Sequence, residues 1–284
     1  MLNKFSDKWK IKIIETGSFR LDGGAMMGSV PKVLWEKTNP PDKLNRIELS
    51  MRCLLLDNGK DVILIETGIG NKNNENFSNM FSIKQSSFPL KKELDIHGYS
   101  LDDITHVILT HLHFDHAGGA TYFDGTKNVP TFPNAEYIVS KSNWEAGLNP
   151  NPKDVASYLS ENFIPIKDSN QLRLVDDDAQ IMKGISGMSF YGHTIGQQLI
   201  KLDFDNDSLV FCSDLIPLKS HLKIPWIMGY DLNAMKTLHE KTLFLKEASE
   251  KKWLLFFYHD PKVVAVRIEQ GAKYYDVVEE YLAE

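Results

Sequence analysis

The chain has 284 residues, of which 42% are hydrophobic and 11% aromatic, enough to form a large buried core. Its formal net charge of -6 argues against nucleic acid or an anionic membrane as the main partner, because either would favour clustered Lys and Arg. Cys53 and Cys212 lie far apart in strand-like apolar runs, which indicates buried thiols instead of a disulfide framework. The first ten residues hold no apolar stretch suited to a secretory signal or membrane span, so we expect a cytoplasmic protein.

The first predicted elements form a hairpin. Residues 52–56 and 62–65 are apolar and flank Asn58-Gly59, a pair that favours the positive φ angles of a tight turn. We therefore expect two buried antiparallel strands there. The polar, Asn-rich residues 71–87 lack periodicity and predict an exposed loop or a short irregular helix at the rim of the molecule.

Short strands and helices alternate along the rest of the chain. Apolar runs separated by turn residues predict strands at residues 137–140, 172–175, 188–191, 198–204 and 208–212. Apolar residues at helical spacing predict a helix over 232–248, followed by a strand over 253–258 and a terminal helix over 273–282.

The organisation of these elements predicts the fold class. No low-complexity linker or repeat marks a boundary, so we expect a single domain over residues 1–284. Many strands are apolar on both faces, which predicts an α/β fold of two sheets packed face to face, with helices on the outer faces.

The strongest chemical signal is the sequence His111-Leu112-His113-Phe114-Asp115-His116, which directly follows the apolar run 104–109. Alternate side chains such as His111 and His113 can converge at the end of a strand. Asp115 and His116 then point elsewhere and can serve a second ion, because one tetrahedral ion cannot use all four ligands. The spacing therefore predicts a metal site.

Three further candidates share this position at the end of a strand-like run: His193, Asp214 and His259. Side chains at strand ends have rigid supports and still face a cleft, as a site of defined geometry requires. We expect them to belong to the same metal site.

Together these residues resemble the metallo-β-lactamase superfamily, whose pattern HxHxDH, His, Asp, His is filled at all seven positions. The resemblance covers most of the chain and implies an αββα sandwich and two metal ions. It implies that His111, His113 and His193 hold one ion and that Asp115, His116 and His259 hold the other. Asp214 would bridge the two.

A narrower resemblance is to a subgroup that contains the quorum-quenching N-acyl-homoserine lactone hydrolases of bacilli and the methyl parathion hydrolases. The stretches that carry it are residues 22–28 (DGGAMMG) with Pro31, Lys32 and Trp35, residues 45–47 (NRI) and residues 227–231 (IMGYD).

Two positions depart from the family pattern. The usual Asp-Thr-Gly after the second strand is Glu66-Thr67-Gly68 here, so the carboxylate that supports a metal-binding His is one methylene longer. The better-known lactonases carry a Tyr three residues after the bridging Asp, where this chain has Pro217. Their tyrosine-assisted mechanism is therefore not expected unchanged.

The predicted function is a dinuclear metal-dependent hydrolase, with a metal-bridging hydroxide opening N-acyl-homoserine lactones. We predict Asp115 and Asp214 as catalytic residues, with zinc as the default metal and Mn, Fe or Co as possible substitutes. Apolar and imidazole side chains are candidates for substrate binding: Met26, Met27, Phe114, Ile216, His221 and Trp226. If exposed, Met26, Met27 and Trp35 would also suit a homodimer contact.

Other functions fit the same residues. A phosphotriesterase or arylesterase of the methyl parathion hydrolase type would use the same metals, and sequence does not separate its substrate from a lactone. An iron-dependent persulfide dioxygenase is a third possibility, although a mononuclear enzyme would not need the second ligand set. The expected partner is in each case a small molecule.

Overall fold

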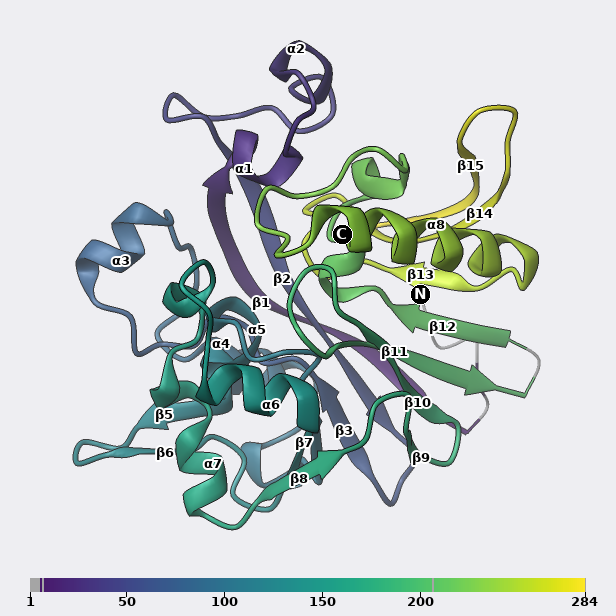
Figure 1. Ribbon diagram of the computed structural model, residues 1–284. Helices are drawn as coiled ribbons and strands as arrows, with labels where there is room; N and C mark the ends of the chain where they lie inside the picture. The colour runs from purple at the N-terminus through teal and green to yellow at the C-terminus, as the bar shows by residue number, and fades with distance from the viewer. Residues whose placement is uncertain (1–5, 7, 206, 284) are drawn as a thin grey trace. The chain divides into compact units, whose positions relative to one another are not determined.

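The structure is a computed structural model that describes residues 6, 8–205 and 207–283 (Figure 1). The chain divides into two compact units. Unit 1 comprises residues 1–18 and 51–177, and unit 2 comprises residues 19–50 and 178–284. The single domain expected over residues 1–284 stays a prediction. Residues 1–5 and 7, which belong to the segment expected to hold no signal, lie outside the described residues.

One mixed sheet has six strands in the order β1-β2-β3-β4-β7-β8. Its hairpin confirms the prediction, because β2 and β3 pair antiparallel with Leu54 opposite Ile65, and Gly59 has a φ of 83°. β3, β4, β7 and β8 pair in parallel. The strands are β1 (Lys10–Asp22), β2 (Arg46–Asp57), β3 (Val62–Ile65), β4 (His106–Ile108), β7 (Glu136–Ser140) and β8 (Leu172–Val175).

Short helices connect the strands of unit 1. The stretch 71–87 contains α3, the short helix that its composition allowed. The helices are α3 (Glu75–Met80), α4 (Pro89–Ile96), η2 (Leu101–Asp103), α5 (Phe114–Ala117), η3 (Gly118–Ala120), α6 (Lys141–Leu148), η4 (Val155–Ser157), η5 (Ser160–Asn162) and α7 (Ile164–Asp168). A separate ribbon pairs β5 (Thr121–Phe123) with β6 (Asn128–Pro130).

Unit 2 contains a seven-stranded mixed sheet in the order β15-β14-β13-β12-β11-β10-β9 (Figure 1). Only β12 and β13 pair in parallel among the neighbours described. The strands are β9 (Gln180–Met182), β10 (Ile185–Phe190), β11 (Gln197–Phe204), β12 (Asp207–Phe211), β13 (Leu254–Phe256), β14 (Val263–Gln270) and β15 (Tyr275–Leu282).

The long helix α8 (Ala234–Glu250) covers this sheet. Phe244, Leu245 and Ala248 on α8 join one buried cluster with strand residues such as Leu255 and Val266. The prediction of a helix over 232–248 is thus confirmed. The shorter helices of unit 2 are α1 (Gly23–Met27), α2 (Lys32–Trp35), η6 (Ser213–Leu215) and η7 (Lys219–Leu222).

The terminal helix predicted over 273–282 is wrong, because this segment is the edge strand β15. Its residues pair antiparallel with β14, from Gln270 opposite Tyr275 to Val263 opposite Leu282. Burial alternates along β15 with a period of two. Pairing with a neighbouring strand therefore outweighed local helical spacing, as is common for short mixed segments.

The condition for a dimer contact through Met26, Met27 and Trp35 is not met, since they are only 1%, 0% and 1% exposed. Trp35 packs against Gly23, where an added Cβ would lie 2.5 Å from the indole ring. These side chains therefore offer no surface for a dimer contact, and the homodimer stays a prediction without that support.

Both cysteines are free and fully buried, as predicted. Within the part of the chain that the structure describes, no helix combines the length and the apolarity that crossing a bilayer requires. The cytoplasmic location stays a prediction.

Candidate metal centre

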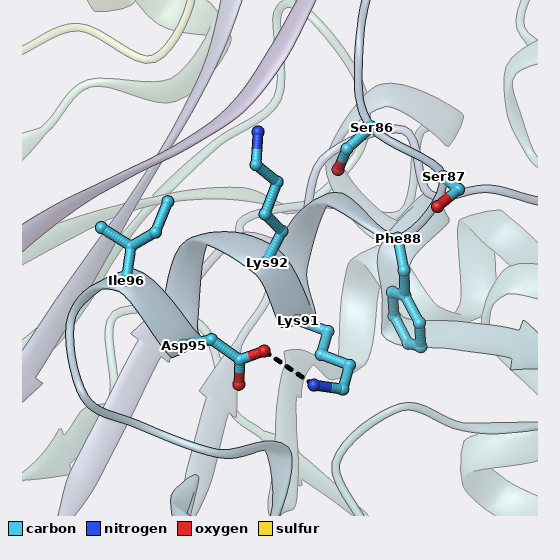
Figure 2. Close-up of a pocket in the computed structure, with 7 residues that line it drawn as sticks. All are labelled: Ser86, Ser87, Phe88, Lys91, Lys92, Asp95 and Ile96. Atoms are coloured by element: carbon cyan, nitrogen blue, oxygen red, sulfur yellow. Dashed lines mark hydrogen bonds and ion pairs between the residues drawn. The ribbon is translucent and has the colours of Figure 1, made fainter.

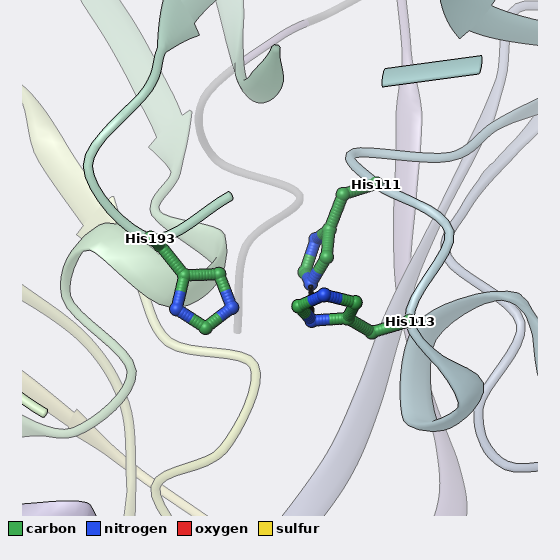
Figure 3. Close-up of side chains that lie close together, drawn as sticks. All are labelled: His111, His113 and His193. Atoms are coloured by element: carbon green, nitrogen blue, oxygen red, sulfur yellow. Dashed lines mark hydrogen bonds between the residues drawn. The ribbon is translucent and has the colours of Figure 1, made fainter. Parts of the chain in front are cut away.

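In unit 1, the first two histidines lie in the loop between β4 and α5. Nε2 of His111 lies 3.1 Å from Nδ1 of His113, and the two rings meet edge to face (Figure 3). Both side chains are buried. The expectation that these alternate residues converge is thus confirmed, and two imidazole nitrogens lie close enough together to face one ion.

Asp115 and His116 follow on α5, directly after the loop that carries His111 and His113. His116 Nε2 lies 3.9 Å from Asp115 Oδ2, and both side chains are buried. The ring centroids of His116 and His111 are 4.0 Å apart. Unit 1 therefore gathers three imidazoles and one carboxylate in a small volume.

Glu66 supports this loop despite its extra methylene. Its Oε1 accepts a hydrogen bond of 2.9 Å from the Thr110 N–H, and its Oε2 lies 3.5 Å from His116 Nδ1. Glu66 is fully buried and has a φ of 69°, a left-handed conformation that is uncommon for a residue other than Gly. The longer carboxylate thus still reaches both the loop and the histidine.

Two residues that sequence reasoning missed, Asn143 and Tyr158, also contact the His111–His113 loop. Asn143 Oδ1 accepts a hydrogen bond from the Leu112 N–H, and Asn143 Nδ2 donates to the Tyr158 hydroxyl. The Tyr158 ring lies 4.8 Å from the His113 ring, edge to face. No local motif announces this contact, because Asn143 is 31 residues from Leu112.

In unit 2, His193, Asp214 and His259 each follow a strand, as predicted, after β10, β12 and β13. Asp214 stands between the two imidazoles. His193 Nε2 lies 3.3 Å from its Oδ2, and His259 Nε2 lies 3.2 Å from its Oδ1. Each carboxylate oxygen therefore faces its own histidine, as expected of a bridging ligand; Figure 3 shows the His193 imidazole projecting from its loop.

The other ring nitrogen of each histidine has an oxygen acceptor. His193 Nδ1 lies 3.0 Å from Asp231 Oδ1, and His259 Nδ1 lies 3.0 Å from the Ser50 carbonyl oxygen. When Nδ1 donates, Nε2 is left as the lone-pair nitrogen that binds metals. Asp231 was not identified from sequence, although it ends the Ile227–Asp231 stretch that carried the subgroup resemblance.

The backbone of Asp214 is held as well. The Gln197 side chain faces the N–H groups of Asp214 and Leu215, and its amide oxygen accepts from both at 3.0 Å in the orientation that satisfies its neighbours. Gln197 is fully buried at the start of β11. The Asp214 backbone is therefore held by the first residue of β11.

Asp260 lies next to His259 and is buried. It is 6% exposed, and its carboxylate accepts hydrogen bonds from the N–H groups of Lys219, Lys262 and Val263. Three backbone donors explain its burial. Asp260 ties the loop after His259 to the segment that begins η7.

The six candidate substrate contacts are largely buried. Phe114 and Trp226 keep 9% and 8% exposure, whereas Met26, Met27, Ile216 and His221 have 1% or less. His221 Nε2 lies 3.0 Å from the Met26 carbonyl oxygen, and burial, reinforced by the charge of Lys241, lowers the pKa of His221 to about 3. His221 is therefore neutral at physiological pH, and substrate contact by these residues stays a prediction.

Cys212, two residues before Asp214, does not act as a thiolate ligand. Burial raises the pKa of its thiol far above the ordinary value, and the side chain is fully buried. The prediction that it is a buried hydrophobe is confirmed.

The chemistry of the donors fits a metal. All seven predicted ligands are buried, at 7% exposure or less. Buried imidazoles and carboxylates that face one another are costly unless a cation or hydrogen bonds compensate them. Nitrogen and carboxylate oxygen donors of this kind suit Zn²⁺ and related divalent ions.

Two surface hollows lie apart from these seven residues. One, of about 560 Å³, lies over α4 in unit 1, where Lys91 Nζ and Asp95 Oδ2 pair at 2.7 Å (Figure 2). The other, of about 890 Å³, lies in unit 2 between η7 and β15 and has Asp260 in its wall.

Comparison with known proteins agrees with a metal site. Residues 49–259 match the metallo-beta-lactamase superfamily. An N-acyl homoserine lactonase of Bacillus thuringiensis is 27% identical over 236 residues, which cover 78% of this chain and 84% of the relative. The crystal structure of a probable metal-dependent hydrolase from Staphylococcus aureus is 28% identical, with a TM-score of 0.89 and 98% of each chain covered. AidC, a dizinc quorum-quenching lactonase in complex with a product, is 20% identical, with a TM-score of 0.81 over 99% of this chain and 97% of its own.

The chain belongs to the metallo-β-lactamase superfamily. Its fold class is the one predicted, an α/β fold of two mixed sheets with helices. Within that superfamily it is a metal-dependent hydrolase.

Proposed function

We propose that this protein is a dinuclear lactonase that opens N-acyl-homoserine lactones. The observation that carries the proposal is Asp214, whose two carboxylate oxygens face the Nε2 atoms of two histidines at 3.3 and 3.2 Å. A carboxylate placed in this way can join two ions. The lactonase relatives named above support the choice of substrate.

The seven donors divide into two sets. One ion would be held by His111, His113 and His193, and the other by Asp115, His116 and His259, with Asp214 bridging. Zinc is the default metal, because tetrahedral sites built from imidazole and carboxylate suit it, and Mn, Fe or Co can take its place. When bound, the two ions supply Lewis acidity and a water molecule whose pKa is lowered toward neutrality.

The residues of the chain account for proton transfer. During hydrolysis, water adds to the lactone carbonyl carbon, the ring C–O bond breaks, and the ring oxygen takes up a proton. Asp115 is a buried carboxylate close to the donors and can orient the water and carry its proton to the leaving oxygen. Pro217 stands where the better-known lactonases carry Tyr. Asp115 is therefore the main residue for orienting the water and transferring its proton.

An aromatic cluster next to the donors supports an apolar substrate. Phe114 lies between His113 and Asp115 in sequence, and its ring packs against Phe77 of α3 and against Phe81 just after it, with centroids 5.2 and 5.3 Å apart. Phe77 and Phe81 are partly exposed. This wall suits an acyl chain, because apolar contact contributes most of the affinity for such groups.

The same wall favours a second candidate function. Aromatic rings also accommodate the aryl group of a phosphotriester or an aryl ester, by offset or edge-to-face contact. A phosphotriesterase of the methyl parathion hydrolase type would use the same two ions, so substrate preference separates the two candidates.

The test combines metal quantification with a matched substrate panel. The purified full-length protein should contain two divalent ions per chain and should open N-acyl-homoserine lactones with a higher kcat/KM than it shows for aryl phosphotriesters or a cephalosporin. Turnover of phosphotriesters above that of lactones would favour the second candidate. Iron at one ion per chain with oxygen uptake on a persulfide would refute both.

A further inference from the structure

Helix α8 carries two adjacent charged residues, Glu240 and Lys241, and the side chain of each forms hydrogen bonds with backbone atoms. Glu240 is half-buried and accepts hydrogen bonds from the N–H groups of Tyr191 and Gly192, at 3.0 and 2.9 Å. These two residues directly precede His193. The carboxylate of Glu240 therefore holds the backbone from which the His193 side chain projects.

Lys241 points into the protein and is fully buried. Its Nζ donates to the carbonyl oxygens of Lys223 and Trp226, at 3.0 and 2.5 Å. No carboxylate of the described residues forms an ion pair with it. Burying an ammonium group without a counter-ion is costly. We therefore expect the hydrogen bonds from Lys241 to the backbone to serve the fold or the function.

The loop that Lys241 holds leads directly to the partner of His193. Two residues after Trp226, the Met228 N–H donates to Asp231 Oδ2 at 3.2 Å. The other oxygen of Asp231 lies 3.0 Å from His193 Nδ1. Lys241 therefore anchors one end of a short loop, and Asp231 at the other end orients the imidazole.

The two residues that directly precede α8 contact the same segment through the backbone. The Leu232 N–H donates to the His193 carbonyl oxygen at 3.1 Å, and the Asn233 N–H donates to the Gly192 carbonyl oxygen at 2.9 Å. Gly192 allows the helix to approach, because an added Cβ would lie 2.4 Å from the Thr237 nitrogen. Helix α8 and the residues just before it thus hold His193 in two ways. They bind the backbone of His193 and Gly192, and they hold the loop that carries Asp231.

We infer that Glu240 and Lys241 are positioning residues for His193, one holding the backbone before it and the other holding the loop that carries Asp231. This inference rests on the proposed dinuclear centre, in which His193 is a ligand. It goes beyond that proposal because neither residue touches a predicted ligand side chain. Their effect would pass through the orientation of one imidazole.

The experiment compares Glu240→Gln and Lys241→Met with a matched control pair on the same helix. Lys246 and Glu250 are exposed and 3.9 Å apart, so Lys246→Met and Glu250→Gln make the same chemical changes away from His193. Zinc affinity of each full-length protein is measured by chelator competition, and folding by circular dichroism. We expect the affinity for one of the two ions to fall about 10- to 100-fold in both test variants, with the other ion retained. The control variants should bind both ions like wild type.

Two results would overturn the inference. The first is unchanged affinity for both ions in folded Glu240→Gln and Lys241→Met. The second is equal weakening of both ions, which would indicate a general stabilising role. Glu240→Gln conserves the size of the side chain at a half-buried position. If Lys241→Met does not fold, the zinc affinity of Glu240→Gln alone tests the inference. A wild-type protein that binds no ions would instead refute the proposed function, so the two failures are distinguishable.

Discussion

His193 Nδ1 lies 3.0 Å from Oδ1 of Asp231, a buried carboxylate 38 residues further along the chain. On its other side, His193 Nε2 faces Asp214. In the proposed centre this imidazole lies between two carboxylates with different roles. The Nδ1–H would donate a hydrogen bond to Asp231, and Nε2, which faces Asp214, would bind a metal.

Asp231→Asn should weaken metal binding without unfolding the protein. The amide is a poorer acceptor and can turn its NH₂ group toward His193, which then loses its preferred tautomer and orientation. We expect about a 10- to 100-fold loss of affinity for one ion, measured by zinc competition with a chelator. Asp203→Asn, on the surface beside Lys201, is the control and should bind zinc like wild type. Equal affinities of the two variants would contradict the role of Asp231.

Asp214→Ala and His116→Ala should each remove one ion and nearly all turnover. Asp214 faces two histidine nitrogens, so its loss removes the bridge, whereas His116 belongs to only one ligand set. We expect lactone hydrolysis to fall by roughly two orders of magnitude or more in each variant. Elemental analysis checks the metal content alongside kcat. Two ions retained in Asp214→Ala would exclude the bridging role.

Glu66→Asp should destabilise the protein. The shorter side chain cannot hold the Thr110 N–H while remaining beside His116, and an unsatisfied buried N–H costs about 1–3 kcal/mol. Asp tolerates the left-handed backbone of this position better than Glu does, which offsets part of the loss. Urea unfolding measures the change, with Glu136→Asp in the surface pair with Arg173 as the control. A midpoint equal to that of wild type would show that the Asp of related proteins fits this backbone equally well.

Lys241 should make stability depend on pH above neutrality. Burial lowers its pKa to about 7, and the charge of Asp231 opposes this only in part. The unfolded chain holds the proton up to the ordinary pKa of 10.5, so the folded state gains stability as pH rises from 7 toward 10.5 and loses it as pH falls through 7.

The measurement compares wild type with Lys241→Met in urea at pH 7 and pH 9.5. The difference in unfolding free energy, wild type minus variant, should rise by roughly 3 kcal/mol between these two pH values. The same difference at both pH values would mean that Lys241 titrates in its ordinary range.

Phe81→Ala should alter the preference for acyl-chain length. Its ring belongs to the Phe77–Phe81–Phe114 cluster, so truncation removes apolar surface next to the donors. We expect KM for long-chain lactones to rise about tenfold while KM for short-chain lactones and kcat change little. Met80→Ala, 65% exposed on the same segment, is the control. A uniform loss across all chain lengths would place the cluster outside the substrate path.

Much of the fold was predictable because its signals are local. The Asn58-Gly59 turn specifies the β2–β3 hairpin, and the apolar spacing of α8 is helical over several turns. The helix predicted over 273–282 was wrong because Val277, Val278 and Tyr281 suit a strand as well as a helix. The pairing with β14 decides between the two. Strand β14 was not predicted either, because its formation depends on pairing with β13 and β15 on its two sides.

The candidate site divides in the same way. The seven candidate ligands could be predicted because strand-end placement and the HxHxDH spacing are visible in the sequence. The residues that hold these side chains in place could not be predicted from the sequence. The Ser50 carbonyl oxygen, for example, contacts His259 across 209 positions, and any residue type can supply a backbone oxygen. Asp231, Gln197 and Asn143 are common polar residues, and only their folded neighbours show what they hold.

The burial of both sulfhydryl groups has a practical consequence for biochemical work. Since Cys53 and Cys212 have no exposed surface, reductants and alkylating agents should leave the native enzyme intact, and no cross-linked species should form on storage in air. An inhibitor aimed at thiols that nonetheless stops turnover would be acting elsewhere, most simply by removing metal.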